Sequence, residues 1–251
     1  MPTLILLRHG QSQWNLEDRF TGWVDVDLTA RGEAEARKGG DLLKTAGVSI
    51  DRVFTSVLTR AIRTSWLALH AAGQVFVPEI KDWRLNERHY GGLTGLNKTE
   101  TAAKHGEAQV TVWRRSYDVP PPELPPGGEY DFSSDRRYAG AVLPVTESLK
   151  TTLERVQPYW DTEIAPCLRR GETLLVAAHG NSLRAIVKVL FGVSDTDIVG
   201  VEIPTSNPLL IELDAGLKPT AARYLDADRA TALPPIQGGF SGAPPGLILG
   251  L

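Results

Sequence analysis

Hydrophobic residues fall in short runs along the first half of the chain, and each run is followed by a polar loop or a segment with helical spacing. Short apolar runs are typical of buried strands, whereas apolar residues at every third or fourth position are typical of amphipathic helices. We predict strands at residues 3–7, 51–56 and 74–80. We predict helices at residues 30–46 (with Thr29 as the N-cap), 58–72, 99–105 and 107–115.

The second half of the chain continues this alternation of strands and helices. A long helix is predicted at residues 145–165, where the residues spaced to line one face are Leu149, Leu153, Val156, Trp160 and Ile164. Further strands are predicted at 173–180, 200–203 and 208–214, and a further helix at 181–192. Strands that alternate with helices imply an α/β fold with a mostly parallel, layered sheet.

Nothing in the sequence divides the chain into two units, so we predict a single α/β domain over residues 1–228. Residues 117–143 are rich in proline near their start and show little periodicity, which predicts a long loop. This loop either covers a ligand pocket or is a surface insertion. Residues 229–251 form an apolar tail with no charged residue after Arg229, and we assign it no role.

The composition is that of a soluble globular protein, with 42% hydrophobic and 23% charged residues. The formal net charge of −3 argues against a general nucleic-acid or membrane-surface binder, because such proteins carry a broad positive field. The apolar runs are shorter than the ~18 residues of a membrane span and the ~7–15 residues of a signal-peptide core. The single cysteine, Cys167, has no internal disulfide partner. We therefore predict a cytoplasmic protein.

Two predicted strands end in the same dipeptide. Residues 6–10 are "LLRHG" and residues 176–180 are "VAAHG". Because ligands bind at the carboxyl ends of strands in open α/β sheets, neighbouring positions for these strands would bring His9 and His179 together. A lone histidine in such a place is more often a satisfied core or turn residue. Two histidines in matching contexts, one of them next to Arg8, favour a functional site.

Such a histidine pair is suited to phosphoryl transfer. Imidazole has a pKa near ~6.5, so it serves as a neutral nucleophile or as a charged donor near neutral pH. Arginine side chains stabilise phosphoryl oxygens, although each one taken singly is more often a solvated surface charge. The candidate bases are Arg8, Arg60, Arg88, Lys98, Arg114 and Arg115. The five histidines lack the close spacing of zinc ligands, so we predict no metal site.

The segments "LLRHGQSQWN" and "AAHGNS", together with Arg60, resemble the histidine phosphatase superfamily, whose motif is Arg-His-Gly at the end of the first strand. Within that superfamily, further segments resemble the cofactor-dependent phosphoglycerate mutases. These segments are "RFTGWVDVDLT", "TSVLTRAIRT", "WRLNERHYGGLTGLNK", "VWRRSYDVPPP" and "AAHGNSLRA". The similarity covers about residues 3–213. Several long matching segments make it far more specific than a lone Arg-His-Gly triplet.

The resemblance implies a central, mostly parallel sheet flanked by helices on both faces, assembled as a homodimer or homotetramer. It implies interconversion of 3-phosphoglycerate and 2-phosphoglycerate, with a phosphohistidine primed by 2,3-bisphosphoglycerate and with no metal. His9 is then the nucleophile, Arg8, Arg60 and His179 are its phosphate-pocket partners, and Glu87 is the proton donor and acceptor. The implied substrate-binding residues are Ser12, Asn15, Thr21, Gly22, Tyr90, Lys98, Arg114, Arg115, Gly180 and Asn181.

Two features of the chain depart from that family's pattern. Gln11 stands where the family usually has glutamate, and the apolar tail differs from the polar, lysine-bearing tail common in the family. Two other functions stay open at this point. One is a phosphatase of the same superfamily, in which water replaces the acceptor hydroxyl. The other is a catalytically silent binding module, although the presence of His9, Arg8, Arg60, Glu87 and His179 together opposes it.

Overall fold

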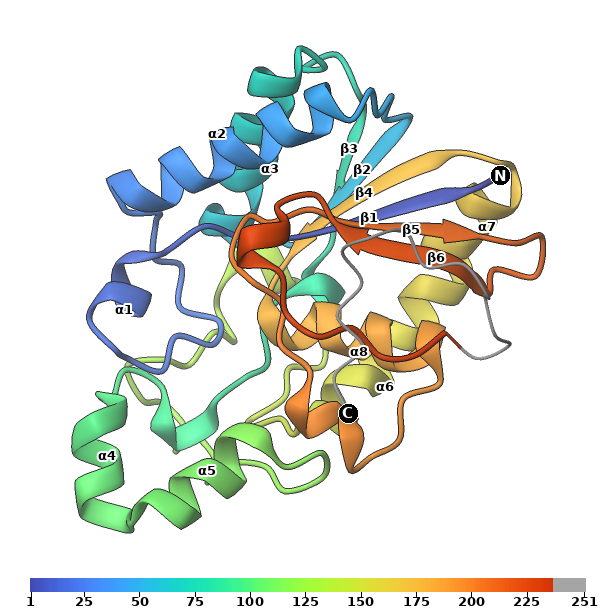
Figure 1. The fold of residues 1–251 in the computed structure, drawn as a ribbon. Coiled ribbons are helices and arrows are strands. Elements are labelled where there is room, and N and C mark those ends of the chain that lie inside the picture. The colour runs from blue at the N-terminus through green and yellow to red at the C-terminus, as the bar shows by residue number, and fades with distance from the viewer. Residues whose placement is uncertain (237–251) are drawn as a thin grey trace.

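A six-stranded sheet runs through the computed structural model, which describes residues 1–236. The sheet order is β3-β2-β4-β1-β5-β6 (Figure 1). Its strands are β1 (Thr3–Arg8), β2 (Arg52–Thr55), β3 (Glu79–Lys81), β4 (Thr173–Ala178), β5 (Leu209–Leu213) and β6 (Pro219–Tyr224). The first four are mutually parallel where they pair, and β5 and β6 run antiparallel. The predicted mostly parallel α/β sheet is therefore confirmed.

Helices cover both faces of this sheet (Figure 1). One face packs against α2 (Ala30–Thr45) and α3 (Thr59–Ala72), and the other packs against α6 (Leu149–Tyr159), α7 (Ala165–Arg169) and α8 (Gly180–Phe191). Outside these layers lie α1 (Gln13–Leu16), α4 (Lys98–His105) and α5 (Glu107–Arg115). Among residues 1–236, no helix is both long enough and apolar enough to cross a membrane.

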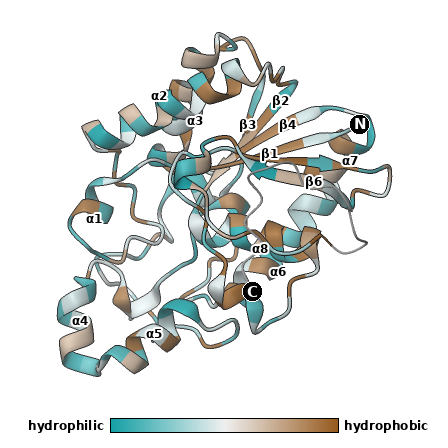
Figure 2. Ribbon diagram, viewed as in Figure 1, coloured by the Kyte–Doolittle hydropathy of each residue, from teal (hydrophilic) through white to brown (hydrophobic). Residues whose placement is uncertain are grey.

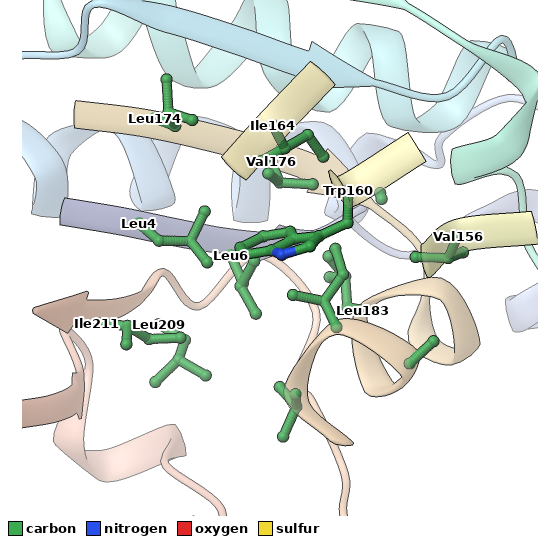
Figure 3. Close-up of a cluster of buried hydrophobic side chains, with 14 of the residues drawn as sticks. Leu4, Leu6, Val156, Trp160, Ile164, Leu174, Val176, Leu183, Leu209 and Ile211 are labelled. Atoms are coloured by element: carbon green, nitrogen blue, oxygen red, sulfur yellow. The ribbon is translucent and has the colours of Figure 1, made fainter. Parts of the chain in front are cut away.

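The strand β1 shows how the sequence divides the core into two layers. Leu4 and Leu6 belong to the cluster beneath α6–α8, whereas Ile5 and Leu7 belong to the cluster beneath α2 and α3. Successive side chains of a strand point to opposite faces, so a continuous aliphatic run fills both clusters. Figure 3 shows Trp160 reaching toward Leu6 in the first cluster. Figure 2 shows the complementary pattern on α2, whose ribbon changes between hydrophilic and hydrophobic colours.

A pair of glycines holds the loop after β1 against α2. A Cβ atom at Gly10 would lie 2.2 Å from the carbonyl oxygen of Gly32, and a Cβ at Gly32 would lie 2.0 Å from that of Gln11. Side chains cannot occupy either position without moving the backbone, which explains a glycine in the first turn of α2. This close approach fixes the chain directly after His9.

The helices predicted at 30–46, 58–72, 99–105 and 107–115 are confirmed within one or two residues. Thr29 caps α2 as expected, since its hydroxyl accepts the Gly32 N–H at 3.1 Å. The strands predicted at 3–7, 51–56, 173–180 and 208–214 are also confirmed, with shifted ends.

One predicted strand does not form, another begins five residues later than predicted, and two of the helices and strands have no counterpart among the predictions. Residues 200–203 form no strand, because the Ile203 carbonyl accepts the Arg8 side chain at 2.9 Å instead of a ladder hydrogen bond. The strand predicted at 74–80 is replaced by β3 at Glu79–Lys81, since the Gln74 side chain bonds the backbone of residues 48 and 50. The two elements that were not predicted are β6 and α1. The residues of β6 are mostly small and α1 has four residues, so neither shows a hydrophobic pattern.

In place of the single helix predicted at 145–165, the structure has three successive helical segments. Together they cover residues 149–169, so they begin and end four residues later than predicted. Ser148 caps α6 by accepting the Thr151 N–H, so the helix begins at Leu149. Pro158 lacks an N–H, and a π-helical turn at Trp160–Ile164 follows it before α7. The predicted apolar face is nevertheless buried in one cluster, with Leu153 packed against its edge.

Residues 117–143 form a long loop that contains a single 3₁₀ turn at Arg136–Tyr138. Phe132 and Tyr138 pack against Trp23, and Tyr130 packs against Trp14. The loop therefore packs against the segment between β1 and α2, which contains Trp14 and Trp23. Of the predicted tail at 229–251, the part after residue 236 lies outside the described residues, whereas Leu233 and Ile236 pack against the core.

Candidate active site

The two His-Gly dipeptides meet at one edge of the sheet. The pairing of β1 with β4 places Arg8 opposite Ala178, and the His9 N–H donates to the Ala178 carbonyl at 2.9 Å. The rings of His9 and His179 are 5.0 Å apart between centroids, at 61° to each other. Both histidines are buried. The structure thus brings together the pair that the sequence analysis singled out.

The hydrogen bonds of His9 define which ring nitrogen is available. Nδ1 lies 2.7 Å from the Gly10 carbonyl, which can only accept, so Nδ1 carries the proton. The lone pair is then on Nε2, and it accepts from Arg60 Nε at 3.3 Å. Burial, Arg60 and Arg8 hold the pKa of His9 well below its ordinary value of 6.5. His9 is therefore a neutral imidazole whose unprotonated nitrogen is Nε2.

Arg60 lies in the first turn of α3, directly after β2, and is buried. Its two terminal nitrogens donate to the carbonyls of Gly22 and Val24 at 2.8 and 2.9 Å. Gly22 has a φ of +53°, a conformation that favours glycine. Burial lowers the pKa of Arg60 to about 10, so the guanidinium stays charged at neutral pH. Two backbone carbonyls thus fix a buried cation beside His9.

His179 is the residue that precedes α8, and its Nε2 lies 2.8 Å from the hydroxyl of Ser56. That hydroxyl also accepts the Leu58 N–H at 3.2 Å. Burial, with Arg60 and His9 as the next causes, holds the pKa of His179 well below 6.5. Its Nδ1 has no hydrogen-bond partner within residues 1–236, and neither has the Nε of Arg8. Both atoms thus have hydrogen-bonding capacity that the described chain leaves unused.

Glu87 approaches the histidines from the segment between β3 and α4. Its Oε1 accepts the N–H groups of Arg88 and Asn181 at 2.8 and 3.1 Å. The other oxygen, Oε2, lies near Gly180, where an added Cβ would be 3.6 Å from it and from Arg8. Arg155, paired with the buried Glu147, donates to the Glu87 carbonyl at 2.9 Å. One carboxylate oxygen is thus anchored, and the other faces the cavity.

Two cavities, of about 210 and 150 Å³, meet at Arg8, Glu87, Tyr90 and Arg114. The smaller cavity is also lined by His9, Asn15, Thr21, Gly22, Arg60 and Lys98. The larger one contains Arg115, Gly180 and Asn181. Of the residues predicted for the site, Ser12 and His179 are outside both linings: His179 packs on His9, and the buried Ser12 hydroxyl caps α1. Residues 117–143 are also outside both linings.

Four polar residues of the site were missed by the sequence analysis: Ser56, Arg19, Arg184 and Glu202. Arg184 follows Asn181 by three residues on α8, and helical spacing could have placed it on the same face. It donates to the Asn181 side chain at 3.0 Å, and burial lowers its pKa to about 10. Glu202 is one of residues 200–203, which were predicted to form a strand and do not form one. Ser56 carried no local signal, because its partner is 123 residues away.

The cavities suit a ligand with several negative charges. Cationic side chains outnumber carboxylates in both linings, and several buried polar atoms lack a partner within the described chain. In the linings these atoms are Arg8 Nε, Thr21 Oγ1 and Arg184 Nε, and His179 Nδ1 belongs to the ring that packs on His9. Within residues 1–236, no group of three or more histidine, cysteine, aspartate or glutamate side chains is placed to hold a metal ion.

The model of the histidine phosphatase superfamily (branch 1) matches residues 4–217. The chain belongs to this superfamily. A protein of Caulobacter vibrioides (strain NA1000 / CB15N) named "2,3-bisphosphoglycerate-dependent phosphoglycerate mutase" is 76% identical over 236 residues, which cover 94% of this chain and 100% of the relative. A protein of the same name from Hyphomonas neptunium is 65% identical over 93% of this chain and 99% of its own.

The fold is also shared with solved structures of low sequence identity. A mycobacterial glucosyl-3-phosphoglycerate phosphatase in complex with VO3 has a TM-score of 0.67 at 20% identity, covering 89% of this chain and 97% of that chain. An α-ribazole-5'-P phosphatase described as putative, from Escherichia coli, has a TM-score of 0.62 at 22% identity, covering 89% and 94%. These likenesses show the histidine phosphatase fold alone.

The buried histidines make stability depend on pH. Burial lowers the pKa of His89 to about 4 from 6.5, and the Gly91 N–H needs the unprotonated Nδ1 as its acceptor at 3.0 Å. Between these two pH values the unfolded chain binds more protons, so the free energy of unfolding falls as pH falls from 6.5 to 4. One such site is worth about 3 kcal/mol, and His9 and His179 add in the same direction.

We expect His89→Asn, which keeps an acceptor at the Nδ1 position, to show a shallower loss of stability over this pH range. Urea unfolding at a series of pH values measures the slope. His70→Asn, at an exposed position near the end of α3, is the matched control and should leave the slope unchanged. Equal slopes for His89→Asn and the wild type would contradict the neutral buried state of His89.

Proposed function

We propose that this chain is a 2,3-bisphosphoglycerate-dependent phosphoglycerate mutase that interconverts 3-phosphoglycerate and 2-phosphoglycerate through phosphorylated His9. The observation that carries the proposal is the larger cavity, in which Arg114, Arg115 and Arg184 continue the cationic lining beyond His9. A phosphatase that hydrolyses a simple phosphate ester needs one anion site. A mutase must also hold the carboxylate or second phosphate of its substrate. The bacterial relatives named as mutases support the same activity.

The residues present fit a bisphosphorylated carboxylate. Arg8, Arg60 and His179 would hold the phosphoryl group next to His9, with Asn15, Thr21 and Gly22 beside them. The other anionic groups would contact Tyr90, Lys98, Arg114, Arg115 and Asn181. When bound, 2,3-bisphosphoglycerate supplies the phosphoryl group that primes His9. Guanidinium groups form short charge-assisted hydrogen bonds with phosphate and carboxylate oxygens, so the protein itself supplies the positive charge.

His9 and its neighbours are arranged to form and break a bond between nitrogen and phosphorus. The Gly10 carbonyl keeps the Nδ1 proton in place and stabilises the positive charge that the ring gains when Nε2 is phosphorylated. In the free protein Arg60 Nε donates a hydrogen bond to His9 Nε2, so it lies where it would bind an oxygen of a phosphoryl group on that nitrogen. If Ser56 donates to His179 Nε2, the proton of His179 is on Nδ1, the nitrogen without a partner. Preorganised donors of this kind stabilise the transferring group.

Glu87 would move the proton of the substrate hydroxyl. As the hydroxyl oxygen forms its bond to phosphorus, the bond from phosphorus to His9 breaks, and Oε2 of Glu87 accepts the hydroxyl proton. In the reverse transfer the same oxygen returns that proton. The two N–H groups on Oε1 fix the carboxylate while Oε2 takes part in the transfer.

We also propose that the chain assembles as a homodimer or homotetramer. Four exposed apolar side chains surround the edge strand β3: Trp66 on α3, Val75 and Phe76 before the strand, and Ile80 on the strand, with 55%, 66%, 79% and 37% of their surfaces exposed. Large exposed apolar patches mark interaction sites, and an unpaired strand edge favours pairing with a second copy. Phe76 is the most exposed of these side chains.

The proposed activity is tested by the phosphoenzyme. We expect the wild type to form an acid-labile phosphoenzyme with 2,3-bisphosphoglycerate and to isomerise 3-phosphoglycerate in the presence of EDTA. His9→Ala should form no phosphoenzyme, because its nucleophilic nitrogen is gone; intact-protein mass spectrometry at neutral pH measures this. Labelling of His9→Ala at wild-type levels would place the nucleophile elsewhere. Faster hydrolysis of simple phosphate esters than isomerisation by the wild type would favour a phosphatase.

Glu87→Gln should lower the rate of isomerisation by ~10²–10⁴-fold, the usual effect of a general acid–base group. Phosphorylation of His9 by p-nitrophenyl phosphate should fall far less, because p-nitrophenolate leaves without being protonated. Rapid-quench measurement of both reactions separates the two effects. Equal losses in both assays would make Glu87 a structural residue and not a proton carrier.

The exposed apolar side chains around β3 should determine the oligomeric state. We expect the double variant Trp66→Ala/Phe76→Ala to be a monomer under conditions where the wild type is a dimer or tetramer, as measured by light scattering after gel filtration. Leu16→Ala, at a residue that is 61% exposed elsewhere on the surface, is the matched control. A monomeric wild type, or a variant with unchanged mass, would refute this assembly.

A further inference from the structure

Arg115, one of the bases predicted to bind substrate, is already paired with a carboxylate of the same chain. Its terminal nitrogen donates to Oε1 of Glu202, in the loop between α8 and β5. Arg115 is in the last turn of α5. Within residues 1–236, no other hydrogen bond or ion pair involves the Arg115 side chain. The side chains are 35% and 53% exposed, so water and small ions reach the pair.

The pair lies on the wall of the larger cavity. Glu202 and Glu87 are the two carboxylates among its described lining residues, against the four arginines Arg8, Arg114, Arg115 and Arg184. Glu87 is anchored by two backbone N–H groups, whereas Glu202 is bonded to Arg115 alone through its side chain. The hydrogen bond from Arg115 lowers the pKa of Glu202, so it is a carboxylate at neutral pH. The cavity thus holds one carboxylate that is exposed and exchangeable.

We propose that Glu202 is a specificity-determining residue: it occupies Arg115 in the free enzyme and gives way to an anionic group of the ligand. The proposal rests on the proposed function, since the ligands are the mono- and bisphosphorylated glycerates. A ligand carboxylate or phosphate offers Arg115 the same charged oxygen atoms as Glu202 does. Binding is then an exchange of one anion for another at Arg115.

The negative charge of Glu202 remains in the cavity after this exchange. It repels each ligand in proportion to the charge of that ligand, because the electrostatic energy grows with the product of the charges. A bisphosphorylated glycerate carries one more phosphate than a monophosphorylated one. Glu202 therefore weakens the binding of both ligands, and it weakens the binding of 2,3-bisphosphoglycerate more.

Removing the charge should act on affinity. Exposed ion pairs are weak, so we expect Glu202→Gln to lower KM for 3-phosphoglycerate by about two- to fivefold. The concentration of 2,3-bisphosphoglycerate that gives half-maximal phosphorylation of His9 should fall by a larger factor. The value of kcat should not rise, because tighter binding of substrate and product alike does not lower the barrier of the chemical step.

The experiment compares the wild type, Glu202→Gln and Asp41→Asn in both assays at fixed ionic strength. Asp41→Asn removes one negative charge from an exposed position on α2 and is the matched control, with unchanged constants expected. An Arg115→Ala background tests the route of the effect, since the gain in affinity should shrink when Arg115 is absent. Thermal unfolding of each variant shows whether its fold is intact.

Three results would overturn the proposal. A higher KM in Glu202→Gln would mean that Glu202 orients Arg115 for binding. An equal fall in both constants would mean that Glu202 does not discriminate by charge. A gain that persists in full without Arg115 would mean that the exchange at Arg115 is not its cause. Failure of the proposed function is distinguishable, because the wild type would then show neither isomerisation nor phosphorylation of His9.

Discussion

The parallel pairing of β1 with β4 is the constraint on which the site depends. The His9 N–H donates to the Ala178 carbonyl one residue before His179, so the two histidines leave the sheet side by side. β2 pairs with the other edge of β4, which brings Ser56 to the ring of His179 and starts α3 where Arg60 reaches His9. Three adjacent strand ends therefore deliver both histidines, a hydroxyl and an arginine to one place, without any long flexible segment.

Burial makes this cluster both costly and effective. The terminal nitrogens of Arg60 donate to backbone carbonyls, and the guanidinium forms no ion pair with a carboxylate within residues 1–236, so its charge remains available to a ligand. The histidines stay neutral because burial and the neighbouring arginines oppose a further positive charge. In the cavity linings, the Nε–H groups of Arg8 and Arg184 find no partner within the described chain, and an anionic ligand would satisfy them. The fold thus accepts unsatisfied polar atoms at the place where an anion is expected.

The outer part of the site is held differently. Glu87 is fixed through the buried pair of Glu147 and Arg155, which bonds the backbone of residues 84–89. By contrast, α4 and α5 pack through a small separate cluster of Phe20, Leu93 and Val110. Arg114 and Arg115 are at the end of α5, so the bases for the far end of the ligand lie on a smaller support than those around His9. A phosphoryl site held by many buried hydrogen bonds and an outer site on a smaller apolar cluster fit the proposed reaction, in which one substrate must present two different oxygens.

The sequence by itself determined the central layers and the inner site. Continuous aliphatic runs predicted β1 and β4, capping and helical spacing predicted α2 to α5, and the rule that strand ends meet at one edge predicted the contact of His9 with His179. These signals are local, or they follow from a general property of parallel sheets. Tertiary structure decided the rest, because it depended on partners distant in sequence. Ser56 has a role only beside His179, and Glu202 only beside Arg115. The segment around Glu202 has the residues of a strand, but the Arg8 side chain takes the Ile203 carbonyl that a ladder would need. The hydrophobic pattern of a sequence indicates which residues become buried. The hydrogen-bond partners of polar groups are determined only when folding brings distant segments within hydrogen-bonding distance.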